Sequence, residues 1–201
     1  MVRMTKPDFV DRFVTVPDLL SAYDRVITMD RGLFRAAGGR YDNPTPCREW
    51  NVGQLLCHFA FINERYAIVA ERETVPPFEQ RTYPDSSAAF VKWSARARAA
   101  FRRPGFLTEV MPTPIGEQPG AVVIQHVLNE LIAHSWDLAR ALGESTDLVP
   151  DLAEAATRSW KTAFAEFGEP ARTPSIIDTV KPAPANASPA DRLAAWLGRE
   201  V

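Results

Sequence analysis

Residues 129–143 read N-E-L-I-A-H-S-W-D-L-A-R-A-L-G, a segment in which two metal-binding residue types stand among helix-forming ones. Glu130 and His134 are four residues apart, so a helix places them on one face, one turn apart. The other residues on that face are apolar: Val123, Val127, Leu138 and Ala141. An apolar face of this kind points toward the core, which predicts that Glu130 and His134 face the interior of a helical protein.

The rest of the chain predicts one helix after another, because apolar residues recur at helical spacing between capping signals and Pro or Gly breaks. No segment shows the strand-helix alternation of a parallel sheet, although residues 106–111 fit either a short strand or an extended loop. The sequence therefore predicts an all-α bundle. The expected helices run from the capping box at 15–18 to about Ala37, from Asn51 to about Arg72, over 86–102, from near Pro119 to Gly143, over 150–167, and from the cap at 188–191 through Leu197.

Length and composition limit the organisation and the partners. The 201 residues suit one domain, and we expect a single domain over 1–201 with a core at about 16–168 and a proline-rich C-terminal extension at 169–201. A net charge of -2 gives no electrostatic footprint for nucleic acid. No apolar run is long enough to span a membrane, and the N-terminus has no signal-peptide pattern. We expect a cytoplasmic protein with two reduced cysteines, as a monomer or homodimer.

A second segment supplies another histidine. Residues 44–58 read P-T-P-C-R-E-W-N-V-G-Q-L-L-C-H, and His58 shares its helix face with the apolar residues Leu55, Ile62 and Val69. A buried glutamate costs much free energy unless it is paired or binds a metal. His58, Glu130 and His134 would together form an open, three-ligand metal site. Two imidazoles and a carboxylate suit Zn(II), and would also accept Ni(II), Fe(II) or Co(II).

The spacing leaves a plainer interpretation open, since a histidine on an apolar face is often a core residue without a metal. The third histidine, His126, is eight residues before His134 and lies about 80° around the helix from it. We therefore expect His126 to be a partly exposed histidine outside the site.

The two segments also carry a resemblance. The pattern P-T-P-C-x-x-W-x-V-x-x-L-x-x-H, followed by E-x-x-x-H-x-W-D-L-A-R-A-x-G, resembles the N-terminal domain of mycothiol-dependent maleylpyruvate isomerases, within the DinB-like group of metal-binding bundles. Residues 187–199 resemble the ending of short actinobacterial members, so the resemblance extends from about Val16 to Arg199. It implies a DinB-like four-helix bundle with extra C-terminal helices. It also implies that His58, Glu130 and His134 bind a divalent metal, usually zinc, which holds mycothiol as a thiolate.

The resemblance has one departure that affects the expected activity. The isomerases carry a further C-terminal domain that helps to bind substrate, whereas this chain ends soon after the expected fifth helix and one short helix. We therefore expect a metal-dependent and mycothiol-dependent transferase or isomerase that acts on a small electrophile, rather than the maleylpyruvate reaction itself. Two alternatives stay open: a non-catalytic metal-binding bundle in stress response or interaction, and a metal-dependent hydrolase.

Polar and aromatic neighbours of the candidate ligands have two interpretations each. Asp137 and Arg140 could support the site, but a structural pair on the helix surface is the favoured interpretation. Trp50 and Trp136 are expected to be packing residues. The two cysteines could serve as nucleophiles, although a small buried hydrophobic role is favoured for both: Cys47 and Cys57.

Overall fold

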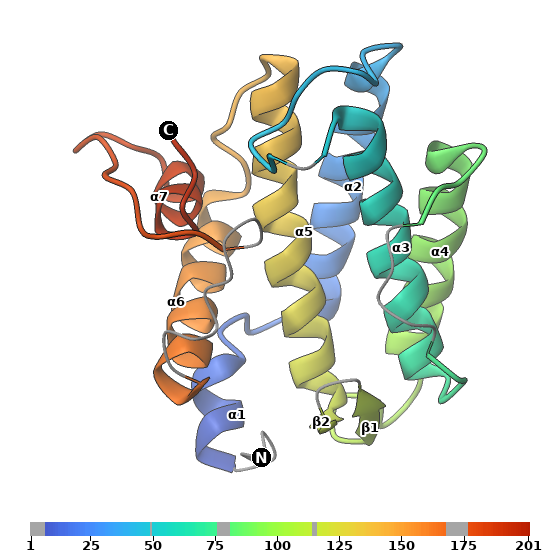
Figure 1. Ribbon diagram of the computed structural model, residues 1–201. Coiled ribbons are helices and arrows are strands. Elements are labelled where there is room, and N and C mark those ends of the chain that lie inside the picture. The colour runs from blue at the N-terminus through green and yellow to red at the C-terminus, as the bar shows by residue number, and fades with distance from the viewer. Residues whose placement is uncertain (1–6, 49, 76–80, 114–115, 168–176) are drawn as a thin grey trace.

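The computed structural model describes residues 7–48, 50–75, 81–113, 116–167 and 177–201, and it is almost entirely helical (Figure 1). The all-α prediction is confirmed, with the DinB-like bundle and the extra C-terminal helices that the resemblance implies. The elements are α1 (Pro7–Phe13), α2 (Leu19–Ala37), α3 (Val52–Ala70), α4 (Ser86–Phe101), β1 (Val110–Thr113), β2 (Gly116–Pro119), α5 (Gly120–Leu142), α6 (Pro150–Phe167) and α7 (Pro189–Trp196).

Four long helices form the bundle, with α3 against α4 and α5, and α2 against α5 and α4. The predicted capping box at the start of α3 is present: the Gln54 backbone amide donates to Asn51 Oδ1, and the Asn51 amide donates to Gln54 Oε1, both at 2.9 Å. At the end of α5, Gly143 has a φ of 70°, a left-handed conformation that favours glycine. These local signals fix the ends of the two helices that carry the candidate ligands.

The start of α2 differs from the prediction. Its N-cap is Asp18, whose side chain accepts from the Ser21 amide at 3.0 Å. Thr15 has another role: its amide donates to Gln125 Oε1 at 3.0 Å and its hydroxyl donates to the Ala155 carbonyl at 2.8 Å. The predicted box at 15–18 is therefore wrong in its capping residue, because Thr15 finds long-range partners on α5 and α6.

The remaining helices, α1, α6 and α7, extend the bundle beside α5, on the side away from α4 (Figure 1). Helices α6 and α7 both pack against α5, and the indole Nε1 of Trp136 donates to Asp191 of α7 at 2.7 Å. Helix α1 was not expected from the sequence. Its Phe9 and Phe13 rings stack at 5.2 Å and are buried in a small cluster with Val122 of α5.

A two-stranded antiparallel hairpin, β1 and β2, leads directly into α5. The strand that was expected as one option at 106–111 begins only at Val110, and the preceding residues form turns. A Cβ on Gly120 would lie 2.0 Å from the carbonyl oxygen of Phe106, so only glycine fits at this junction. Across the described part of the chain, we find no helix with the length and hydropathy needed to cross a membrane.

Candidate metal centre

The three residues expected to bind a metal lie together between α3 and α5. One ligand atom from each of His58, Glu130 and His134 lies within 4.8 Å of the others. The Nε2 atom of His134 is 3.8 Å from Glu130 Oε2, and the two imidazole rings meet edge to face with centroids 4.7 Å apart. The helical spacing therefore brings the predicted residues to one place. Metal binding by them stays a prediction.

The cluster is mostly buried: His58 is 8% exposed, and the side chains of His134 and Glu130 are 13% and 21% exposed. Burial, followed by the influence of His134, holds the pKa of His58 well below its ordinary value, so His58 is a neutral imidazole. Neutral imidazole is the form that binds metals. The Trp50 ring covers both histidines, with centroids 4.4 Å from His58 and 5.7 Å from His134. Trp50 is thus a packing residue, as expected, and the residues it packs against are two of the candidate ligands.

A buried carboxylate orients His134. The Nδ1 atom of His134 lies 3.1 Å from Oδ2 of Asp137, which has no exposed surface. Burial alone would raise the pKa of Asp137, but Arg199 and the hydrogen bonds from His134 and Arg199 lower it well below its usual range. An ionised carboxylate only accepts hydrogen bonds, so Nδ1 carries a proton and donates a hydrogen bond to Asp137 Oδ2. Nε2, the nitrogen that faces Glu130, is then the atom able to bind a metal.

Asp137 has its own partner, and it is not the one that the sequence suggested. Arg199 donates from Nε to Asp137 Oδ1 at 3.1 Å and from Nη2 to Oδ2 at 3.0 Å. The expected surface pair of Asp137 with Arg140 is wrong, because Asp137 faces the interior. Arg140 is exposed, with its guanidinium 6.0 Å from the centre of the Trp136 ring. Asp137 thus supports the site, which was the less favoured interpretation.

Cys47 also contacts this carboxylate. Its Sγ donates to Asp137 Oδ2 at 3.0 Å, and it lies 3.6 Å from His134 Nδ1 and 3.7 Å from Arg199 Nη2. Burial, with Asp137 beside it, raises the pKa of the Cys47 thiol strongly, so the thiol stays protonated. The expectation of a buried cysteine is correct, but the residue also donates a hydrogen bond. Cys57 is likewise buried, and neither cysteine forms a disulfide.

A second group of potential ligand atoms comprises Cys47, His134 and Asp137. Both carboxylate oxygens of Asp137 are already engaged by Arg199, and its Oδ2 also accepts from Cys47 and His134. We interpret this group as the support of the first cluster. His126 belongs to neither group, as expected, although its pKa, which burial lowers, is also influenced by Glu130. It is partly buried, with its ring centroid 5.6 Å from that of Tyr66 and 6.4 Å from that of Trp160.

Sequence reasoning missed the support around the ligands, although signals were present. Asp137 belongs to the W-D-L-A-R motif, and Arg199 ends the tail segment that carried the resemblance. Their pairing joins residues 62 positions apart, which spacing within one helix could not indicate.

The helical bundle and its cluster of two histidines and one carboxylate are the features expected of a DinB-like protein. Comparison with known proteins agrees with this class. The model of the mycothiol maleylpyruvate isomerase N-terminal domain matches residues 28–139, and the chain belongs to this family. Relatives include the uncharacterized proteins MT0763 and Rv0738 of Mycobacterium tuberculosis, from strains CDC 1551 / Oshkosh and ATCC 25618 / H37Rv. Each is 38% identical over 160 residues, which cover 79% of this chain and 84% of the relative. No solved structure gives a significant match.

Proposed function

We propose that His58, Glu130 and His134 bind one divalent metal ion, with Zn(II) as the first candidate and Ni(II) or Fe(II) as others. We further propose that the protein is a mycothiol-dependent transferase or isomerase acting on a small electrophile in the cytoplasm. The observation that carries the proposal is the convergence of the three ligand atoms within 4.8 Å, at a site lined by α3 and α5.

The donor set fits a metal of this kind. Two neutral imidazoles and one carboxylate are typical ligands of catalytic zinc, and a three-residue set leaves a position for another molecule. Ligand atoms of a tetrahedral ion lie about 3.4 Å apart when each bond is about 2.1 Å long. The 3.8 Å between His134 Nε2 and Glu130 Oε2 is close to that separation and too long for a hydrogen bond.

The chemistry follows from the charge of the site. A divalent ion held by two neutral histidines and one carboxylate keeps a net positive charge, and when bound it would lower the pKa of a thiol beside it. The resulting thiolate sulfur is the nucleophile that attacks an electrophilic carbon. In an isomerase the thiolate would add to a conjugated double bond, breaking its π bond, and would leave after rotation. In a transferase the new carbon–sulfur bond would remain, and the adduct would either take up a proton at the neighbouring carbon or expel a leaving group.

The chain's own residues orient and enclose the site. Asp137 holds the proton on His134 Nδ1 and fixes the ring, and Arg199 fixes Asp137. Trp50 packs against both histidine rings. Cys47 keeps its proton because its pKa is raised, so the proposed nucleophile comes from an external thiol and not from Cys47. The family description supports mycothiol as that thiol.

Calorimetric titration of mycothiol into the metal-loaded and the metal-free protein tests this proposal. We expect binding to the loaded form with proton release near neutral pH, and far weaker binding to the metal-free form. Equal binding to both forms would contradict a metal-held thiol. Absence of binding, with hydrolysis of an ester panel, would favour the hydrolase alternative, and absence of both would favour a non-catalytic bundle.

A further inference from the structure

The surface arginines of this protein fall into two groups. Most of the described arginines lie within 4.0 Å of a carboxylate oxygen; Arg98 and Arg102, for example, share Asp24 at 2.7 Å each. Arg31 and Arg35 are among the exceptions, as are Arg140 and Arg158: none of them forms an ion pair or a side-chain hydrogen bond with any residue in the described part of the chain. Arg31 and Arg35 lie four residues apart on α2, so their charges repel across one helical turn.

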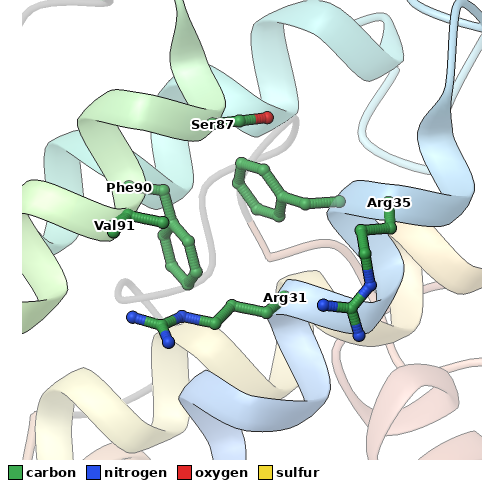
Figure 2. Close-up of a pocket in the computed structure, with 6 residues that line it drawn as sticks. Arg31, Arg35, Ser87, Phe90 and Val91 are labelled. Carbon is green, nitrogen blue, oxygen red and sulfur yellow. The ribbon is translucent and has the colours of Figure 1, made fainter.

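Both arginines line a surface cavity of about 230 Å³ between α2 and α4. Figure 2 shows the Arg31 side chain extending from α2 toward Phe90 and Val91 of α4, while the Arg35 side chain runs back along α2 at the other end of the cavity. No described acidic side chain lines this cavity. Asp85, next but one to Ser87, is engaged in capping α4, where its Oδ1 accepts from the Ala88 amide.

The cavity is apolar on its other sides. The rings of Phe34 and Phe90, which both line it, stack with centroids 4.5 Å apart at an interplanar angle of 18°. Val91 is an apolar side chain with 47% of its surface exposed at the edge. The lining thus combines two guanidinium groups and one hydroxyl with three apolar side chains.

We propose that this cavity binds a small organic carboxylate that carries an apolar body. A planar guanidinium matches the two oxygens of a carboxylate, and two guanidinium groups without an internal counter-charge favour an anion. The apolar lining favours a ligand with a hydrocarbon or aromatic portion over an inorganic ion, because burial of that portion adds free energy. The bound anion also removes the repulsion between Arg31 and Arg35.

The cavity is separate from the candidate metal centre. Phe34 meets Phe59 edge to face at 5.7 Å, and Phe59 in turn lies 6.5 Å from His134, so aromatic side chains fill the space between the two places. This site therefore does not depend on the proposed function, and the two proposals can fail independently.

Benzoate titration of the full-length protein, followed by amide shifts in NMR spectra, tests the proposal. We expect saturable shifts at residues around Arg31, Arg35, Ser87 and Val91. The double variant Arg31→Gln/Arg35→Gln should weaken binding at least about tenfold, because two charge-assisted hydrogen bonds are lost. Circular dichroism would show that these exposed substitutions keep the fold.

A second cavity provides the matched control. It lies between α6 and α7 and is lined by Arg158, Lys161 and Arg192, but also by Glu154. Arg158→Gln should leave benzoate binding within about twofold of the unaltered protein. Unchanged binding in the Arg31/Arg35 double variant would overturn the proposal, as would loss of binding in His134→Ala, which would place benzoate at the metal centre. Equal binding of benzyl alcohol or of inorganic phosphate would overturn the assigned ligand class.

Discussion

Arg199 and Asp137 form a bidentate ion pair in the interior, through Nε to Oδ1 at 3.1 Å and Nη2 to Oδ2 at 3.0 Å. The pair joins the segment after α7 to the last two turns of α5. Removing one partner of such a pair leaves an uncompensated buried charge. Because Asp137 also accepts from His134 Nδ1, the pair holds the histidine ring in place as well as holding the C-terminal segment to the bundle.

Asp137→Asn should weaken metal binding about 10- to 100-fold, since the carboxylate that orients a metal-binding histidine contributes on that scale. Competition with a chromogenic chelator measures this affinity.

Arg199→Ala should destabilise the fold by about 3–5 kcal/mol in urea unfolding, because it leaves Asp137 buried without its cation. Arg192→Ala, which removes an exposed arginine on α7, is the control and should change neither quantity appreciably. Metal affinity unchanged in Asp137→Asn would remove the orienting role.

His134→Ala should abolish stoichiometric metal in the purified protein while leaving most helicity, because the bundle has its own apolar core. Elemental analysis and circular dichroism measure the two effects. His126→Ala is a matched control on the same helix and should retain the metal. Full metal content in His134→Ala would show that the ion, if present, is bound elsewhere.

Cys47 and Cys57 should react slowly with thiol reagents in the folded protein, and Cys47→Ala and Cys57→Ala should retain turnover once a substrate is known. The reason is that both are buried, and burial raises the pKa of Cys47 so that little thiolate forms. A colorimetric thiol assay at pH 8, with and without denaturant, gives the rates. Rapid modification of one cysteine in the folded state, or loss of turnover with metal retained, would instead indicate a nucleophile on the protein.

Asp30 should make the protein less stable as the pH rises. It has no exposed surface, and burial raises its pKa well above the ordinary value of 3.8. Ser135 Oγ can donate to Asp30 Oδ1 or to the Leu131 carbonyl, each 2.6 Å away, and its hydrogen bond to Asp30 offsets only part of the effect of burial on the pKa. A carboxyl whose pKa is higher in the folded than in the unfolded state stabilises the folded protein. That stabilisation is fully present below the pKa of the unfolded state and is lost as the pH rises toward the pKa of the folded state.

The effect can be isolated with Asp30→Asn, whose side chain does not titrate. The unfolding free energy of the unaltered protein should fall relative to the variant, by up to about 1.4 kcal/mol per pH unit above pH 4. Urea unfolding at pH 5, 6.5 and 8 measures the difference. Parallel pH profiles for the two proteins would mean that Asp30 is ionised in the fold.

Much of the bundle could be predicted because its signals are local. The capping pair Asn51 and Gln54 and the terminal Gly143 fix helix ends within a few residues of sequence, and helical spacing placed Glu130 and His134 on one inward face. Helix α1 was missed because it is only seven residues long. The spacing of Phe9 and Phe13 indicates a buried helix face only once the tertiary structure shows both rings packed with Val122 of α5.

The support of the candidate site could not be predicted in the same way. Asp137 had a basic residue three positions away, and local spacing favoured Arg140 over a partner 62 positions distant. Burial decided between them, since Asp137 faces the interior and Arg140 faces solvent. Cys47 was expected to be buried, but its hydrogen bond to Asp137 depends on a loop brought against α5 by tertiary packing.

If the cluster binds an ion, the anchoring of Arg199 would let the C-terminal segment control how fast that ion exchanges. Arg199, Asp137 and His134 form one series of contacts, so undocking of residues 177–201 would hydrate the carboxylate and free the histidine ring to rotate. Such undocking is a local unfolding event, with its own free energy below that of the whole protein. The residence time of an ion between α3 and α5 would then follow the opening rate of this segment, which amide hydrogen exchange reports residue by residue.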